Sequence, residues 1–390
     1  MIYFDNSATT AVKPQTVAQA VYQVLSSGEY GNPGRDASSY SLNSSEVIYE
    51  ARCLVKQLFN GKTEDNVIFT KSVTESLNLI INGLLKQGDH VITTNYEHNS
   101  VIRPLERRKQ AGEIEVTYTP FDPKTGVLDL NYLKSAIKKN TRAIICTHVS
   151  NVSGYILPIA ELAKVCQEHH LLFILDAAQS AGIENIDVQQ TPIDVLCFTG
   201  HKSLYGPQGV GGFYLNDPLT IAPLLTGGSG FDSFNKAMPE ILPNKFEAGT
   251  MNTPGIAGLR SGLQYVESVG LDAIQQKLQQ LSGRIKTALS QYPEVKLYTG
   301  EVSYSPSIVA FNVGQMDSAE VCQYLWDDYQ IATRGGAHCA PLVHQTYQTQ
   351  KQGIVRVSLS YFNTDAEVTI FLEAMQKLIQ ELRDDDHANQ

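Results

Sequence analysis

The fold follows from residues 171–180, Leu171-Leu172-Phe173-Ile174-Leu175-Asp176-Ala177-Ala178-Gln179-Ser180. Its first half is a continuous apolar run, which is typical of a strand buried on both faces of a parallel sheet. A second such run, Val195-Leu196-Cys197-Phe198, is followed by Thr199-Gly200-His201-Lys202. Ligands of parallel sheets bind at the carboxyl ends of the strands. The sequence therefore predicts that Asp176 and Lys202 face the same edge of one sheet.

Further apolar runs at 67–69, 91–92 and 143–146 alternate with helical patterns. This alternation predicts an α/β domain with a mostly parallel sheet between helices. From about residue 255 longer helical patterns dominate, at roughly 255–269, 271–291, 318–329 and 365–383, with strands near 294–298 and 307–313. We therefore predict an N-terminal arm (1–15), a large domain (16–254), a smaller α+β domain (255–383) and a disordered tail (384–390).

The composition excludes several classes of protein. The 390 residues include 30 basic and 40 acidic side chains, a net charge of −10, which argues against a nucleic-acid partner or a polybasic membrane surface. No apolar run is long enough to span a bilayer, and the N-terminus lacks the features of a secretion signal. The six cysteines include no C-x-x-C pair, so neither a zinc site nor another metal site is expected. We expect a soluble, cytoplasmic protein.

The common nucleotide motifs are missing. Gly61-Lys62-Thr63 lacks the earlier glycine of a P-loop, and the glycine-rich stretch 206–212 does not fit G-x-G-x-x-G, so NAD and ATP have no support. Residues 69–76, Phe69-Thr70-Lys71-Ser72-Val73-Thr74-Glu75-Ser76, connect a predicted strand to a helix. The free N–H groups and dipole of that helix would attract an anion such as a phosphate. An ordinary helix cap is the alternative interpretation.

The three features together indicate a cofactor. A carboxylate such as Asp176 can keep a pyridinium nitrogen protonated, and a lysine such as Lys202 can form a Schiff base with an aldehyde. With an anion site, these are the groups that pyridoxal 5′-phosphate requires. Taken singly, Asp176 could be a helix cap and Lys202 a solvated turn residue.

At this point the chain resembles the class V aminotransferase fold of pyridoxal-phosphate enzymes (fold type I), and within it the cysteine desulfurase family. The resemblance implies a mostly parallel seven-stranded sheet and a smaller α+β domain. It rests on Tyr3–Thr10, Gly31-Asn32-Pro33-Gly34-Arg35, Thr199–Lys202, Arg334-Gly335-Gly336-Ala337-His338-Cys339-Ala340-Pro341 and Arg356–Thr364. Residues 334–341 match the pattern R-x-G-x-H-C-A-P, in which the cysteine is Cys339. This pattern resembles that of the cysteine desulfurases that work with an accessory sulfur acceptor.

The resemblance implies roles around the cofactor ring. Lys202 would hold the cofactor covalently and move protons, and Asp176 would pair with the pyridine nitrogen. Gln179 would bind the phenolic oxygen. His98 would stack on the ring and act as an acid or base, although a hydrogen-bonded loop histidine is an equally simple interpretation.

It also implies roles around the phosphate and the substrate. The phosphate ligands would be Val73, Thr74, Thr199, His201 and, from the other subunit of a homodimer, Thr250. Arg356 would bind the substrate carboxylate, and Asn151 would lie near the substrate and the phenolic oxygen. The alternatives are turn residues for Asn151 and Thr250 and half of an ion pair for Arg356.

Cys339 selects the reaction. It lies in a loop of small residues beside His338, where a cationic neighbourhood would favour a thiolate, whereas the other five cysteines lie in apolar patterns. The family then implies conversion of L-cysteine to L-alanine, with the sulfur held on Cys339 as a persulfide and passed to an acceptor protein or thiol. The alternatives are a selenocysteine lyase acting on L-selenocysteine, a cysteine sulfinate desulfinase or a class V aminotransferase. A non-catalytic sulfur carrier or regulatory protein that binds pyridoxal phosphate is less favoured.

Overall fold

A computed structural model describes residues 1–34, 38–217, 219–299 and 303–388 of the chain. Its centre is a seven-stranded sheet with the order β2-β8-β7-β6-β5-β3-β4. The strands are β2 (Val67–Thr70), β3 (His90–Thr94), β4 (Glu115–Thr119), β5 (Thr141–Thr147), β6 (Leu172–Asp176), β7 (Val195–Thr199) and β8 (Gly211–Leu215). Neighbours are parallel except that β8 is antiparallel to β2 and β7. The predicted α/β class with a mostly parallel sheet is confirmed.

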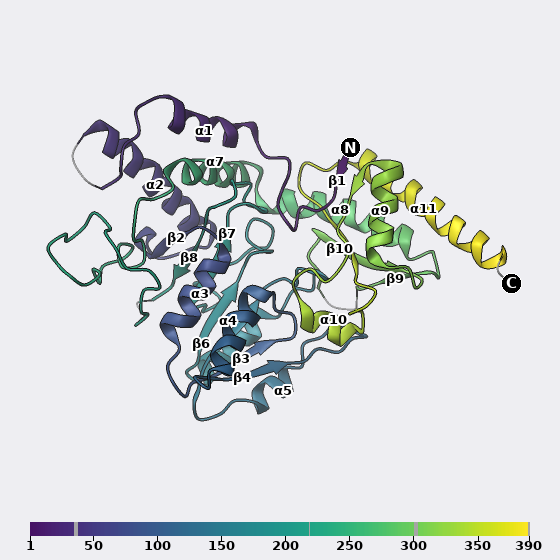
Figure 1. Cartoon of the computed structure of the whole chain (residues 1–390), viewed down its shortest axis with the longest axis horizontal. Coiled ribbons are helices and arrows are strands. Elements are labelled where there is room, and N and C mark those ends of the chain that lie inside the picture. Colours follow the sequence, from purple (N-terminus) through teal and green to yellow (C-terminus); the bar gives the residue numbers. More distant parts are fainter. Residues whose placement is uncertain (35–37, 218, 300–302, 389–390) are drawn as a thin grey trace.

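Helices cover both faces of this sheet (Figure 1). Successive strand residues point to opposite faces, so Phe173 and Leu175 join the core with α2, α6 and α7, while Ile174 joins the core with α3 and α4. The helices of this part are α1 (Gln15–Ser26), α2 (Ser39–Leu58), α3 (Val73–Leu84), α4 (Asn99–Gln110), α5 (Leu130–Ser135), α6 (Ile159–Glu168) and α7 (Thr253–Val269), with a short 3-10 turn at Glu64–Asn66. Burial on both faces explains why the strands appear in the sequence as continuous apolar runs.

Two strands carry no such signal in the sequence. Strand β4 lies at the edge of the sheet, and only Thr119 of its five residues is buried, so its composition is polar. Strand β8 begins with Gly211-Gly212, which looks like a turn. A Cβ atom on Gly212 would collide with the carbonyl oxygen of Ile68 on β2, so the close approach of the two strands requires glycine there.

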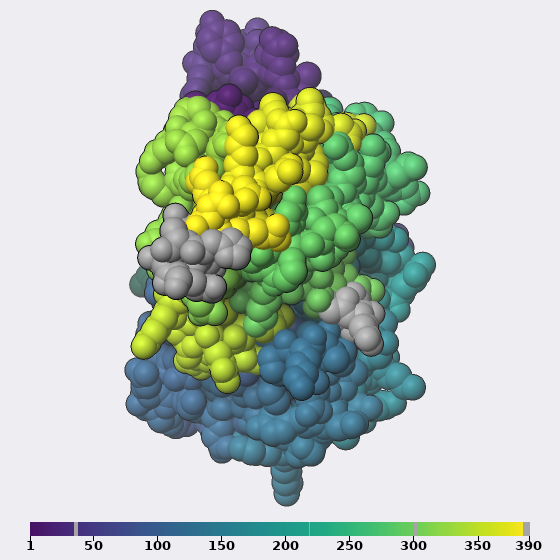
Figure 2. All heavy atoms as spheres, turned by 90° about the vertical axis from the view of Figure 1, so that its right-hand side faces the viewer, coloured from purple at the N-terminus to yellow at the C-terminus, as the bar shows by residue number. Residues whose placement is uncertain are grey.

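The second unit contains a three-stranded antiparallel sheet, β12-β10-β9, formed by β9 (Val295–Leu297), β10 (Ile308–Val313) and β12 (Val355–Ser358). Its helices are α8 (Leu271–Leu289), α9 (Ser318–Tyr329), α10 (Pro341–Tyr347) and α11 (Asp365–Ala388). Figure 2 shows α11, in yellow, running over α8 on one face of the molecule. The N-terminal strand β1 (Ile2–Tyr3) pairs with β11 (Ile331–Ala332), so the start of the chain lies against this C-terminal unit.

Three details bear on the predicted boundaries. Helix α7 packs on α1 and α2, so the division proposed at residue 254 falls at the start of a helix that contacts the large unit; the division stays a prediction. The predicted tail is helical as far as Ala388, because residues 384–388 contain no helix breaker and Gln380 Nε2 donates to Asp384 Oδ1 at 2.9 Å. Arg35 and residues 389–390 lie outside the described residues. No helix in the described ranges is long and apolar enough to cross a membrane.

Candidate active site

A cavity of about 230 Å³ lies where β5, β6 and β7 end. It is lined by all of the residues predicted for the site except Thr250, namely Val73, Thr74, His98, Asn151, Asp176, Gln179, Thr199, His201, Lys202, Cys339 and Arg356. These residues come from the ends of five elements of the large unit and from two segments of the C-terminal unit. The fold therefore brings together a set that is spread over most of the chain.

Asp176 and Lys202 occupy the middle of this edge because β6 and β7 are parallel neighbours. The Asp176 side chain is buried, and its Oδ1 accepts a hydrogen bond from the Ala178 N–H at 2.9 Å. Burial raises the pKa of Asp176, whereas that N–H and the Lys202 ammonium oppose the rise. Burial lowers the pKa of Lys202 to about 8 against the opposing effect of Asp176. The neutral amine of Lys202, which is the nucleophilic form, is therefore populated near neutral pH.

The N-terminus of α3 forms one wall of the cavity. Ser72 caps the helix by accepting from the Glu75 N–H at 3.3 Å, and Glu75 accepts from the Lys71 N–H at 2.7 Å. The cap leaves the N–H groups of Val73 and Thr74 without an acceptor among the described residues. The helix cap and the anion-binding geometry are thus compatible, because the cap uses different N–H groups.

Two polar atoms near this helix end are buried and have no partner among the described residues: Thr199 Oγ1 and His201 Nδ1. Burial, with Lys202 and Lys13 nearby, lowers the pKa of His201 to about 4, so its ring is neutral at pH 7. A buried hydroxyl and ring nitrogen without partners are costly unless a ligand satisfies them. They indicate that a polar group binds here.

His98 is the N-cap of α4. Its Nδ1 accepts from the Ser100 N–H at 3.1 Å, so the ring proton is on Nε2. Burial and then the charge of Lys202 lower the pKa of His98 to about 4, which makes the ring neutral at pH 7. His98 is therefore both a hydrogen-bonded loop residue, as the simpler interpretation held, and part of the cavity lining.

Cys339 is the exposed one of the chain's six cysteines, and the others are buried or partly buried in helices and strands. Its loop has an unusual backbone: His338 and Cys339 have φ angles of 47° and 56°. This left-handed conformation costs a non-glycine residue roughly 1–2 kcal/mol. Hydrogen bonds hold it, from the Asn99 N–H to the Cys339 carbonyl (2.8 Å) and from Asn151 Nδ2 to the His338 carbonyl (2.6 Å).

Arg356 lies on β12 and is 2% exposed. One terminal nitrogen donates to Asp5 Oδ1 at 2.7 Å and the other to the Asn151 carbonyl at 2.7 Å, whereas Nε has no partner among the described residues. Arg356 is thus half of an ion pair, as the alternative interpretation held, and still lines the cavity. Asn151 connects it to the Cys339 loop, since its carbonyl binds Arg356 and its side chain binds His338.

The sequence did not single out three residues that support the site. Asp5 orients Arg356, and Arg334 lines the cavity and is joined to Arg356 through backbone hydrogen bonds. Glu97, which precedes His98 in the chain, is fully buried and accepts from the Thr147 N–H at 3.0 Å. An acidic residue three positions after the buried strand β3 would have been a usable signal for Glu97. Asp5 and Arg334 have a signal only through their motifs.

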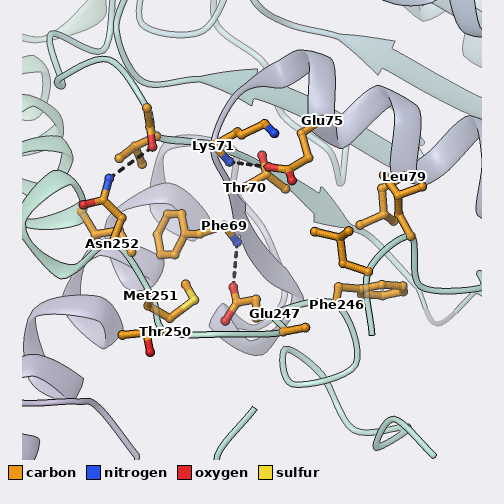
Figure 3. A pocket seen from close by; sticks show the side chains of 16 residues that line it. Phe69, Thr70, Lys71, Glu75, Leu79, Phe246, Glu247, Thr250, Met251 and Asn252 are labelled. Carbon is orange, nitrogen blue, oxygen red and sulfur yellow. Dashed lines mark hydrogen bonds between the residues drawn. The ribbon is translucent and has the colours of Figure 1, made fainter. Parts of the chain in front are cut away.

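Thr250 lies elsewhere in the chain described. It is exposed and belongs to a different cavity of about 260 Å³, shown in Figure 3. There the backbone N–H of Phe69 donates to Glu247 at 2.7 Å, which holds the segment that carries Thr250 against β2. The predicted contact of Thr250 with a phosphate in another subunit stays a prediction, because one chain is described.

Comparisons with known proteins identify the family of this chain. The family model described as "Aminotransferase class-V" matches residues 2–371. A "Probable cysteine desulfurase" from Pyrococcus abyssi (strain GE5 / Orsay) is 33% identical over 98% of this chain and 95% of its own length. A "Cysteine desulfurase" from Escherichia coli (strain SE11) is 31% identical over 97% of this chain and 93% of its own length.

A solved structure has the same fold. The "Apo structure of Cysteine Desulfurase from Thermococcus onnurineus NA1" superposes with a TM-score of 0.89 at 32% identity, covering 97% of this chain and 95% of that one. Enzymes of this family depend on pyridoxal 5′-phosphate. The chain belongs to the class V aminotransferase family and, within it, to the cysteine desulfurases.

Proposed function

We propose that this chain binds pyridoxal 5′-phosphate and converts L-cysteine to L-alanine, taking the sulfur on Cys339 as a persulfide. One observation carries the proposal. Lys202, Asp176, Arg356 and the exposed thiol of Cys339 line a single cavity. Lys202 and Asp176 suit the cofactor, and Arg356 suits an amino-acid carboxylate. The Cys339 thiol distinguishes desulfuration from the other reactions of the fold.

The donor set fits the cofactor. The unpaired N–H groups of Val73 and Thr74, with Thr199 Oγ1 and His201 Nδ1, would hold the phosphate. Asp176 would hold the ring nitrogen, and Lys202, whose Nζ has no hydrogen bond or ion pair among the described residues, would hold the aldehyde carbon.

Three further residues would contact the phenolic oxygen and the ring face of the cofactor. Gln179 would donate to the phenolic oxygen, and the buried, unpaired Asn151 Oδ1 lies at the same cavity. The neutral ring of His98 would cover the cofactor face. When bound, the cofactor supplies an electron sink next to the amino-acid Cα.

The protein's own groups then act on L-cysteine. The Arg356 guanidinium, held by Asp5, binds the substrate carboxylate with its unpaired Nε–H and so fixes the orientation of the side-chain sulfur. The amine of Lys202 takes the Cα proton, which its lowered pKa of about 8 permits near neutral pH.

Cys339 performs the step that selects desulfuration. Its thiolate attacks the substrate sulfur, a sulfur–sulfur bond forms, and the Cβ–S bond breaks. The substrate Cβ keeps the bonding pair and takes a proton, and Lys202 returns a proton to Cα, which gives L-alanine. Selenocysteine cleavage, sulfinate cleavage and transamination need no nucleophile at this position, so an exposed cysteine at the mouth of the cavity favours L-cysteine over these alternatives.

The test measures alanine and sulfide released from L-cysteine with dithiothreitol present. Cys339→Ala should lower both rates at least about 100-fold while the absorbance of the bound cofactor stays unchanged. Cys53→Ala is the matched control, since Cys53 is a partly buried cysteine on α2, and it should retain the wild-type rate. Wild-type rates of sulfide release from Cys339→Ala would refute the persulfide mechanism.

We also propose that the chain acts as a homodimer. The segment from 219 to 252, which carries Thr250, exposes Leu225, Phe231, Phe234 and Ile241 by half or more. Such an exposed apolar group beside a cavity is typical of a surface that another chain covers. Sedimentation of the holoenzyme should give twice the chain mass, and Thr250→Ala should weaken cofactor retention if Thr250 reaches the partner's phosphate.

A further inference from the structure

A second cavity opens on Cys339 from the outside. It has a volume of about 360 Å³ and lies between α3 and α4, which run side by side in Figure 1. It shares Thr74, His98, Ser100 and Cys339 with the proposed active site. The Cys339 thiol therefore stands at the junction of two cavities, one for the substrate and one that leads to the surface.

The outer cavity is lined by cations without carboxylate partners. Arg103 and Arg107 project into it from successive turns of α4, both exposed, and none of its lining residues is acidic. Arg103 makes no hydrogen bond or ion pair with any described residue, and Arg107 donates only to Asn82 Oδ1 at 2.6 Å. Glu106, the acidic residue between them, is engaged with Lys109.

The arginines of the outer cavity differ from most other arginines of the chain in having no acidic partner. In the described part, most arginines form an ion pair with an acidic residue: Arg52, Arg108, Arg260, Arg284, Arg356 and Arg383. Those that form none are Arg103, Arg107, Arg142 and Arg334, and all but Arg142 line one of the two cavities. In a chain with a net charge of −10, three of the four arginines without an ion pair in the described part thus line the two cavities that meet at the reactive thiol.

We propose that the outer cavity is the docking site of the sulfur acceptor, and that the acceptor is a protein whose cysteine is flanked by carboxylates that Arg103 and Arg107 bind. The inference rests on the proposed function, because it assigns the partner that removes sulfur from Cys339. Charge complementarity selects this occupant: the cavity offers two forked donors and no anion, which suits carboxylates on both sides of an incoming thiol. An overall acidic enzyme would otherwise repel such a partner.

The transfer itself is balanced. The acceptor thiolate attacks the outer sulfur of the Cys339 persulfide, a new sulfur–sulfur bond forms on the acceptor, and the bond to Cys339 breaks. Cys339 leaves as a thiolate and the acceptor carries the persulfide. No oxidant or reductant is consumed.

The test uses two peptide probes that differ only in charge: N-acetyl-Glu-Cys-Glu-amide and N-acetyl-Gln-Cys-Gln-amide, each as a mixed disulfide with thionitrobenzoate. The Cys339 thiolate of the holoenzyme attacks the peptide sulfur and releases coloured thionitrobenzoate. The rate measured with Cys339→Ala is first subtracted from each rate. The ratio of the rate with the acidic peptide to the rate with the neutral peptide is then divided by the same ratio measured with free L-cysteine as the attacking thiol. This normalisation removes the intrinsic difference between the two disulfides.

We expect a normalised ratio of about 3 to 10 in the wild type at low salt, since each exposed ion pair contributes a small factor. Arg103→Gln/Arg107→Gln should bring the ratio to about 1, as should high salt. Arg142→Gln, which removes an exposed arginine that forms no ion pair and lines neither cavity, should keep the wild-type ratio. Equal ratios in the wild type and the double variant would overturn the proposal.

The measurement needs no turnover of L-cysteine. It therefore reports on the docking site even if alanine release shows that the proposed function is wrong. Conversely, normal alanine release with no preference for the acidic peptide would refute the docking site alone. Because Arg103 and Arg107 are exposed, their replacement by glutamine should leave the circular dichroism spectrum unchanged.

Discussion

Replacing Glu97 by glutamine should remove a large part of the fall in stability of this protein between pH 5 and pH 8. Glu97 is fully buried. Its Oε1 accepts from Thr94 Oγ1 at 2.6 Å and from the Thr147 N–H at 3.0 Å, while Oε2 has no partner among the described residues. Burial raises its pKa to about 8 against these hydrogen bonds, and Asp176 adds to the rise.

The size of the effect follows from proton linkage. The ordinary pKa of the group is 4.5, so between pH 4.5 and about 8 the folded chain holds a proton that the unfolded chain has lost. The protonated carboxyl contributes its full stability below pH 4.5, and that contribution is lost as the pH rises through 8. The loss amounts to about 1.4 kcal/mol per pH unit, or about 4 kcal/mol from pH 5 to pH 8. Glutamine has the same shape and no charge at any of these pH values.

The assay is urea unfolding of the holoenzyme at several pH values, followed by fluorescence of Trp326 and by circular dichroism. Coincidence of the two signals supports a two-state analysis. The free energy of unfolding of Glu97→Gln, minus that of the wild type, should rise steadily with pH. Glu373→Gln, a change at an exposed position of α11, is the matched control and should run parallel to the wild type. Parallel curves for Glu97→Gln would refute the assignment of a buried, protonated carboxyl.

Three further outcomes are expected. Gly212→Ala should destabilise the chain by at least about 2 kcal/mol in urea unfolding, because the new methyl group would collide with the backbone of β2; an unchanged midpoint would contradict this packing. Asp5→Ala should cost about 3 kcal/mol and raise KM for L-cysteine, because it leaves the Arg356 cation buried without its partner; the same loss in Asp5→Asn would show that shape rather than charge matters. Asn151→Ala should lower the rate of persulfide formation on Cys339 about 10-fold, since one hydrogen bond that holds the loop is lost; a rapid-quench measurement of alanine formation would test this, with cofactor absorbance as the control.

Much of the fold could be predicted from local sequence patterns. The apolar runs predicted β2, β3, β5, β6 and β7 within a few residues, and helical spacing predicted α8, α9 and most of α11. The patterns failed for β4, whose position at the sheet edge leaves it polar, and for β8, where the fold demands glycine. Residues 384–388, which belong to the predicted disordered tail, continue the last helix as far as Ala388.

The sequence by itself determined which residues stand at the carboxyl ends of parallel strands, and hence that Asp176, Lys202 and the start of α3 share one edge. This information is local, since strand direction and side-chain alternation depend on a few consecutive residues. Only the tertiary structure decided that Asp5 and Arg356, 351 residues apart, form an ion pair, and that the Cys339 loop is tied to Asn151. Such contacts depend on how the whole chain closes on itself, and no short-range pattern encodes them.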